Sequence, residues 1–276
     1  MYYFGHTSPK DNVDLMKHMI VNLAEKVRQR QDRDASSQAS GLIVTSVGWV
    51  DGGGLDLLTH IIKAFRINVV IVNGHDRLFA SLQTEAGGGA GGAEAADVTV
   101  IKLMRSGGAV QRTDSDRRRL RKAKIHDYFY GTRRVEAGGL SGEVSGSGMS
   151  VFCPSRVDLP LHKYSLLRCA DEKLSQSMVP LGGLPLSTAA SSSLRLTPIG
   201  ASLGIENCLL GVLHTPSPAG GETEEDMGVA LLNSNIAGFV YVVKVDLDMN
   251  VLTVLSPSPG PLPSTYLVLG SVKWVE

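Results

Sequence analysis

The sequence is poor in the residues that build disulfide frameworks and metal sites. Its 276 residues include only three cysteines, Cys153, Cys169 and Cys208, and no two of them form a C-x-x-C pair. This spacing predicts neither a disulfide framework nor a zinc or redox site, and it is typical of a protein in a reducing compartment. The seven histidines are dispersed, so the sequence predicts no metal ligands.

Long hydrophobic runs are also absent. No run reaches the roughly 18 apolar residues that span a bilayer, and no basic-then-apolar signal peptide opens the chain. The sequence therefore predicts a soluble intracellular protein with no membrane partner. It has 27 basic and 27 acidic residues, so no overall field attracts the protein to nucleic acid. A nucleic-acid contact must come from a local patch.

The phosphate-binding motif G-x-x-x-x-G-K-(S/T) does not occur in the sequence. In proteins that have it, backbone N–H groups wrap the phosphates of ATP, while the lysine and the hydroxyl handle charge and Mg²⁺. The sequence therefore predicts no cofactor-binding residues in this chain.

The first half has the pattern of an α/β domain. Apolar residues recur at helical spacing over residues 14–31 and 55–65, whereas 41–46, 67–72 and 97–103 are short apolar runs rich in branched residues. Strands that are apolar on both faces and alternate with helices predict a parallel sheet flanked by helices. Residues 85–96 are rich in glycine and alanine and are predicted to form a flexible surface insertion.

The second half has the pattern of a small β-rich domain. A glycine- and serine-rich linker is predicted at 132–150, and short alternating runs at 238–245, 251–255 and 266–272 predict strands. Residues 246–250 are predicted to form a hairpin turn, and the acidic cluster at 222–226 an exposed loop. The predicted domains are thus 1–131 and 151–276.

The strongest local charge is a basic segment at 105–124. The planar guanidinium of arginine gives two parallel hydrogen bonds to a phosphate, so this segment is a candidate phosphate-binding site. Asp114 or Ser115 is predicted to cap a helix that presents Arg117 and Arg121 on one face. A solvated helix face or a nuclear-localisation run explains the same charge.

Two further motifs have more than one interpretation. Gly52-Gly53-Gly54 lies between a predicted strand and a helix, where an anion can meet a helix N-terminus, although a tight turn explains it more simply. The segment at 200–204 matches the G-x-S-x-G of serine hydrolases, with Ser202 as the nucleophile and His214 after it. That motif requires a strand, turn and helix in an α/β sheet, whereas here it falls in the β-rich half.

Five short motifs occur in one order along the chain. They are FGHTSPKDN at 4–12, VGWV at 47–50, the arginine segment ending in DYFYG at 127–131, AGFV at 237–240 with VDL at 245–247, and LTVLSPSPGPLP at 252–263. In this order they resemble the polyribonucleotide 5′-hydroxyl-kinase family, which includes the kinase-like subunit of the pre-mRNA cleavage complex, an mRNA cleavage and polyadenylation factor. The resemblance covers nearly the whole chain.

The resemblance implies the RNA-facing part of a kinase-like site. Thr7, Ser8 and Pro9 would match a clasp that holds the RNA end, and Trp49 an aromatic residue that stacks on a terminal base. Arg112, Arg117 and Arg121 would match catalytic lid arginines that close over the transferring phosphate. Pro9 as a helix start and Trp49 as a core residue are the structural alternatives. His6 and the glycine run at 87–92 depart from the family pattern.

The fold implied is the rear part of a P-loop-kinase-like α/β domain (1–131), an incomplete parallel sheet with flanking helices, followed by a β-rich C-terminal domain. The function implied is nuclear mRNA 3′-end processing, with RNA and other cleavage-complex subunits as partners. Members use ATP and Mg²⁺, which this chain alone is predicted not to bind, so it is predicted to be inactive as a kinase.

Two alternatives remain: a non-catalytic scaffold, or an active RNA 5′-hydroxyl kinase when an upstream part is restored. An incomplete sheet exposes an edge and apolar surface, so the chain alone is expected to aggregate or to need a partner.

Overall fold

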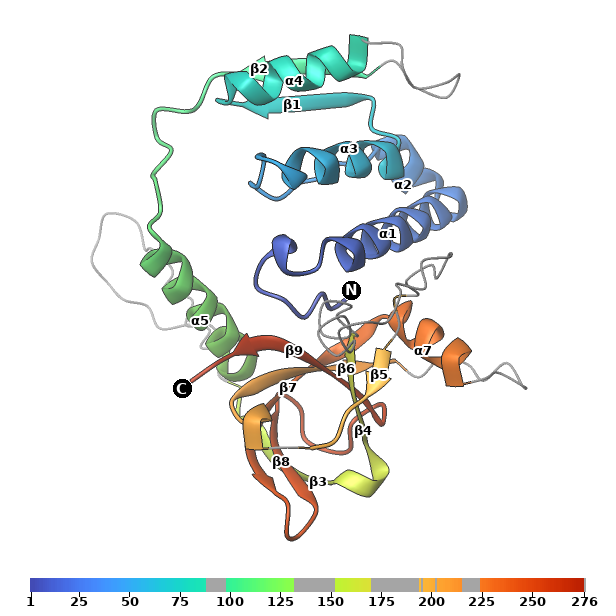
Figure 1. Cartoon of the computed structure of the whole chain (residues 1–276), viewed down its shortest axis with the longest axis vertical. Helices are drawn as coiled ribbons and strands as arrows, with labels where there is room; N and C mark the ends of the chain where they lie inside the picture. Colours follow the sequence, from blue (N-terminus) through green and yellow to red (C-terminus); the bar gives the residue numbers. More distant parts are fainter. Residues whose placement is uncertain are drawn as a thin grey trace, which may run out of the picture. The chain divides into compact units, whose positions relative to one another are not determined.

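The computed structural model describes residues 1–87, 98–131, 152–169, 194, 196–201, 203–214 and 224–275. The chain forms two compact units (Figure 1). We call Asn12–Gln111 the α/β unit, and Met1–Asp11 together with Arg112–Glu276 the β-rich unit. Most of the insertion predicted at 85–96 and all of the linker predicted at 132–150 lie outside the described residues.

The α/β unit alternates helices and strands, as the sequence predicts. Its elements are α1 (Val13–Arg33), α2 (Ala35–Ser40), α3 (Gly53–Phe65), β1 (Val69–Asn73), α4 (Asp76–Gly87) and β2 (Thr99–Leu103). β1 and β2 pair in parallel, with Val69 opposite Thr99 and Asn73 opposite Leu103. The prediction of an α/β fold with a parallel sheet is therefore confirmed.

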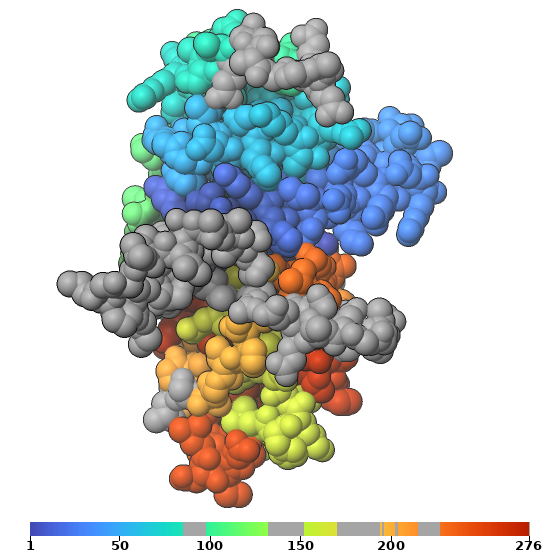
Figure 2. All heavy atoms as spheres, turned by 45° about the vertical axis from the view of Figure 1, so that its right-hand side comes forward, coloured from blue at the N-terminus to red at the C-terminus, as the bar shows by residue number. Residues whose placement is uncertain are grey.

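The helices of this unit bury the residues that recur at helical spacing. Leu15, Ile20 and Ala24 of α1 are buried, as are Leu57 and Leu58 of α3. α1 and α3 contact each other and lie side by side in Figure 1, and their segments also adjoin in Figure 2. The Nε2 atom of His60 lies 3.2 Å from the carbonyl oxygen of Lys17, which adds a polar link between them.

The strand predicted at 41–46 does not form. These residues are extended without strand pairing, and Leu42 and Ile43 have exposed fractions of 41% and 96%. A run of branched residues forms a strand only where a neighbour satisfies its backbone groups, and the described residues offer none here. β1 also differs from its prediction as a doubly buried strand, because Val69 and Ile71 are 49% and 60% exposed.

The β-rich unit is built on one mixed sheet. Its strands are β3 (Ser155–Pro160), β4 (Ser165–Cys169), β5 (Leu196–Pro198), β6 (Cys208–Leu213), β7 (Ile236–Asp246), β8 (Val251–Ser256) and β9 (Tyr266–Lys273). They lie in the order β3-β8-β7-β6-β9-β4-β5. Figure 2 shows the segments of β3 and β8 side by side, although about 95 residues separate Asp158 from its partner Thr253. The prediction of a β-rich C-terminal part is confirmed, including the β7–β8 hairpin turn at 247–250.

Helices complete this unit. They are η1 (Pro9–Asp11), α5 (Asp114–Tyr130), η2 (Leu161–Lys163), η4 (Leu203–Ile205) and α7 (Glu224–Leu232). The loop predicted for the acidic cluster is wrong where the structure describes it, since Glu224, Glu225 and Asp226 form the first turn of α7. A helix of 9 residues is too short to show a clear apolar period in the sequence.

The main core of this unit lies within the sheet. Leu210, Val242, Leu252, Val254 and Leu267 have no exposed surface and belong to one cluster. The first 11 residues and α5 group with the strands of this sheet, although residues 12–111 separate them in the sequence. The domain boundaries at 131 and 151 stay predictions. No helix of the described part is long and apolar enough to cross a membrane.

Candidate functional site

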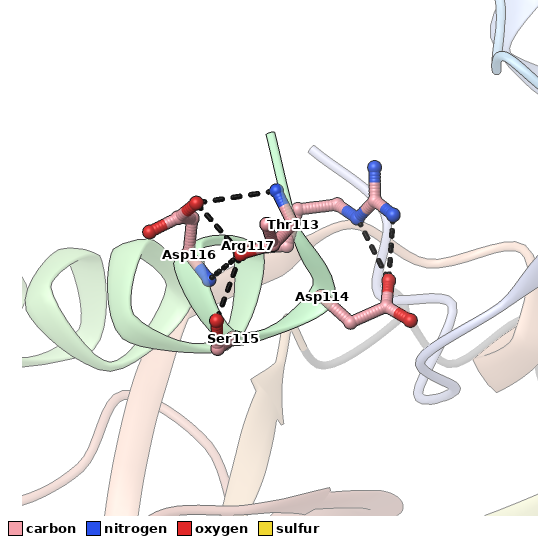
Figure 3. Close-up of polar contacts among 5 residues, drawn as sticks. All are labelled: Thr113, Asp114, Ser115, Asp116 and Arg117. Atoms are coloured by element: carbon pink, nitrogen blue, oxygen red, sulfur yellow. Dashed lines mark hydrogen bonds and ion pairs between the residues drawn. The ribbon is translucent and has the colours of Figure 1, made fainter. Parts of the chain in front are cut away.

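The basic segment begins a helix whose first turn is closed by its own side chains. Thr113 is the N-cap of α5, and its hydroxyl oxygen accepts a hydrogen bond from Asp116 N at 3.2 Å (Figure 3). Thr113 N donates back to Asp116 Oδ2 at 3.2 Å, which completes a capping box. The sequence-based choice of Asp114 or Ser115 as the cap is therefore wrong by one or two positions.

Arg117 is the predicted lid arginine whose contacts are best defined. Its Nε and Nη2 atoms donate to Asp114 Oδ1 at 3.1 and 2.6 Å (Figure 3). The hydrogen bond and the charge of Arg117 lower the pKa of Asp114, with smaller effects from Arg118 and Arg121. The pair is solvent-exposed, so it holds the guanidinium weakly and can yield to a phosphate.

The other two predicted lid arginines flank this turn. Arg112 precedes the cap, Arg121 follows Arg117 by one helical turn, and both are exposed. α5 carries six Lys and Arg and three Asp. Two of those aspartates, Asp114 and Asp116, lie in its first turn, where their negative charge interacts favourably with the positive end of the helix dipole. The helix thus exposes guanidinium groups on a capped first turn and the turn after it.

The predicted clasp forms a short turn at the start of the β-rich unit. Ser8 N donates to Asp11 Oδ2 at 3.0 Å, and Asp11 N donates to Ser8 O at 3.1 Å. Pro9 begins the 3₁₀ helix η1, which fits the structural alternative of a helix start. Thr7 is exposed, whereas Ser8 and Pro9 are half-buried. The groups that this turn can present to a ligand are the hydroxyls of Thr7 and Ser8, which can form hydrogen bonds.

Trp49 belongs to the other unit. It is half-buried and lies against the start of α3, where a Cβ atom on Gly53 would lie 3.3 Å from the indole ring. A Cβ on Gly54 would lie 3.0 Å from the ring and still closer to the Trp49 backbone, so these glycines permit the contact. Gly52 has a φ of 55°, which fits the tight turn preferred for this glycine run. Packing explains this position of Trp49.

Sequence reasoning missed the role of the last turn of α5. Phe129 is fully buried and stacks on Trp274, with ring centroids 5.8 Å apart and planes at 12°. Tyr128 Oη accepts a hydrogen bond from Phe239 N at 2.9 Å, and a Cβ on Gly238 would lie 2.9 Å from that oxygen. The DYFYG motif at 127–131, noted in the sequence only as a resemblance, fixes α5 to β7.

The first five residues were missed in the same way. Tyr3 Oη donates to Leu209 O at 3.2 Å, and Met1 O accepts from Ile236 N at 2.9 Å. Gly5 O accepts from Ser271 N at 2.6 Å. This segment is hydrogen-bonded to three strands of the β-rich sheet, β6, β7 and β9. Neither helical nor alternating periodicity in the sequence predicts these contacts.

The structure places the predicted clasp and the predicted lid arginines in one compact unit, and Trp49 in the other. Ser202 of the G-x-S-x-G segment lies outside the described residues. No group of three or more His, Cys, Asp and Glu within the described ranges has the arrangement of a metal site.

Two family models match the two halves of the chain. Residues 1–131 match the P-loop model of the mRNA cleavage and polyadenylation factor CLP1, and residues 152–276 match the model of the pre-mRNA cleavage complex II protein Clp1. Curated relatives include a protein CLP1 homolog of Arabidopsis thaliana, 34% identical over all of this chain and 54% of its own length. The polyribonucleotide 5′-hydroxyl-kinase Clp1 of Gallus gallus is 28% identical, over all of this chain and 56% of its own.

Solved structures share the fold. A complex of wild-type Clp1p with Pcf11p matches with a TM-score of 0.72 at 20% identity, over 99% of this chain and 55% of the solved one. A second Clp1p structure with Pcf11p, described as explaining ATP loss in a point mutant, matches with the same score at 21% identity. The chain spans about half the length of the curated relatives it matches.

Proposed function

This chain belongs to the family of the pre-mRNA cleavage factor Clp1, and from this premise we propose that it acts in nuclear pre-mRNA cleavage and polyadenylation by holding the 5′ end of an RNA. The observation that carries the proposal is the exposed, capped arginine helix α5 within a chain of this family. Arg112, Arg117 and Arg121 bind phosphate oxygens of the RNA. Thr7 and Ser8, in the same unit, contact the terminal nucleotide.

Phosphate binding by α5 follows from charge and geometry. The Cβ atoms of residues one helical turn apart are about 5–6 Å apart, so the guanidinium groups of Arg117 and Arg121 can reach neighbouring phosphate groups. Arg117 exchanges Asp114 for a phosphate at low cost because the existing pair is exposed. The interaction is independent of base sequence, and it weakens as salt increases.

Phosphoryl transfer is a separate matter in this proposal. Relatives are named as RNA 5′-hydroxyl kinases, and a kinase of this type needs ATP and Mg²⁺ at a phosphate loop. This chain contains no G-x-x-x-x-G-K-(S/T) motif, so we propose that it holds RNA without transferring phosphate to it. A longer protein that adds such a motif to this chain is expected to bind ATP and act as a kinase.

The test is binding of a 5′-hydroxyl RNA oligonucleotide, followed by fluorescence anisotropy. Replacing Arg112, Arg117 and Arg121 by alanine should weaken binding and reduce the slope of log affinity against log salt by about 2, from three lost phosphate contacts on a single strand. A matched control replaces three exposed basic residues of α1: Lys26, Arg30 and Arg33. Equal losses in both variants would show that only net charge matters and would refute the site.

A scaffold role is the second candidate, and the solved relatives favour it because both are complexes of Clp1p with Pcf11p. In this role the chain binds another subunit of the cleavage complex without ATP. Mixing the purified chain with the same organism's counterpart of Pcf11 and measuring complex formation by size-exclusion chromatography tests it. Failure to form a complex at micromolar concentrations would count against this candidate and leave RNA binding untouched.

A further inference from the structure

Two elements that this function assigns to RNA meet at one side chain of the β-rich sheet. Phe239 of β7 contacts Tyr3, which precedes the clasp, with ring centroids 5.2 Å apart and planes at 77°. Phe239 also contacts Tyr128, at the end of α5, with centroids 5.8 Å apart and planes at 78°. Both are edge-to-face contacts, which aromatic pairs favour. Residues 3, 128 and 239 all belong to the β-rich unit.

The end of α5 is fixed by more than this contact. Tyr128 Oη accepts the Phe239 N–H bond, and the fully buried Phe129 lies in a cluster with Tyr241 and Trp274. Tyr241 Oη in turn donates to Asn207 Oδ1 at 2.7 Å. Since a helix is stiff over a few turns, fixing its last turn sets where its first turn points. Arg117 lies 11 residues before Tyr128 in the helix, about 17 Å along the axis.

The clasp is anchored to β9 through Gly5, which precedes Thr7 by two residues. Gly5 O accepts hydrogen bonds from Ser271 N at 2.6 Å and from Ser271 Oγ at 3.3 Å. Gly5 has a φ of 76° and lies against Gly270, where a side chain on Gly270 would overlap the Gly5 backbone. Thr7 follows only two residues later, so the anchor limits where the clasp can lie.

We propose that Phe239, with Tyr3 and Tyr128 on either side, is a joint through which the β-rich unit positions the α5 arginines and the Thr7–Pro9 segment for one RNA 5′ end. The proposal rests on the proposed RNA-binding function. Phe239 and Tyr128 touch no RNA in it. They are positioning residues: Tyr128 acts through the α5 arginines, and Phe239 acts through those arginines and through the Thr7–Pro9 segment.

The experiment uses the full chain and the same 5′-hydroxyl RNA oligonucleotide. Tyr128→Phe removes one oxygen and the hydrogen bond to Phe239 N, and Phe239→Leu removes both aromatic contacts. We expect weaker RNA binding for Tyr128→Phe, by at most about 10-fold, because an indirect effect cannot exceed what the lost hydrogen bond contributes to holding α5. The control is Thr253→Val, which removes a hydroxyl of the same sheet that bonds Asp158 and not α5. It should bind RNA as the parent chain does.

A double-mutant cycle separates positioning from general damage. In the background with Arg112, Arg117 and Arg121 replaced by alanine, Tyr128→Phe should have no further effect, because its influence passes through those arginines. Tyr128→Phe that weakens binding equally in both backgrounds would overturn the proposal. Parent-like RNA binding by both Tyr128→Phe and Phe239→Leu would also overturn the proposal. A triple arginine variant that binds normally would instead refute the RNA site itself, so the two failures are distinguishable.

Discussion

Tyr3 lies near the start of the chain, yet its hydroxyl is held inside the β-rich unit. Burial, and to a smaller extent the Cys208 thiol, raises the pKa of Tyr3 above the ordinary tyrosine value of about 10. The folded chain therefore keeps a proton that the unfolded chain releases at high pH. Its contribution to stability is complete below pH about 10 and declines as pH rises above that value.

We predict that Tyr3→Phe changes the alkaline part of the stability profile. At pH 8 the variant should be less stable by about 1 kcal/mol, because the hydrogen bond to Leu209 O is lost. Between pH 9.5 and 11 the urea midpoint of the β-rich unit, which contains Tyr3, should fall more steeply in the parent chain than in the variant. Urea unfolding across this range measures both effects, and parallel profiles would show that Tyr3 ionises normally in the folded chain.

At the scale of the element, the capping box of α5 makes the arginine helix testable. Thr113→Ala removes the side-chain cap, which should cost about 1 kcal/mol of local helix stability. We predict faster amide hydrogen exchange at Asp116 and Arg117 and little change at Phe129, which is held by the sheet. Ser115→Ala is the matched control, since its hydroxyl contacts Thr113 Oγ1 without capping the helix. Similar exchange in both variants would contradict the capping role.

Helices and strands with strong local patterns were predictable from the sequence. The spacing of apolar residues predicted α1, α3 and the β7–β8 hairpin, because each pattern is local and is fulfilled by neighbours in the chain. The strand predicted at 41–46 shows the limit. Its residues have strand propensity, but no partner strand lies beside them among the described residues.

The candidate site was only half predictable for a similar reason. Local charge density identified the basic segment, and the family resemblance singled out Arg112, Arg117 and Arg121 within it. The contacts that fix α5, however, join Tyr128 to Phe239 across 111 residues. A motif of aromatic residues in a sequence does not say what its rings pack against. The Thr113 cap was misplaced by one or two residues, although a threonine three positions before an acid is its local signal.

At the scale of the whole molecule, the two units differ in how fully they bury their sheets. In the β-rich unit, β6 is buried along its whole length. In the α/β unit, β1 and β2 form a two-stranded sheet, with Ile71 opposite Ile101 and both exposed, at 60% and 42%. Two-stranded sheets are marginal in water, and exposed apolar strands favour association. The α/β unit is therefore expected to be the less stable one.

We predict that the chain unfolds in urea in two steps, the first in the α/β unit. The two tryptophans report separately, because Trp49 lies at the start of α3 while Trp274 is buried with Phe129 and Tyr241. Tryptophan fluorescence should show an early and a late transition, and Trp49→Phe should remove only the early one.

Ile71→Lys extends this test to association, since a charge on the exposed strand opposes edge-to-edge pairing. It should lower the scattering of concentrated samples without moving the late transition of Trp274. A single transition shared by both tryptophans, in a monodisperse monomer, would contradict this prediction. It would show that the exposed strands neither destabilise the α/β unit nor cause the chain to associate. The partner that this two-stranded sheet is expected to need would then be unnecessary for folding.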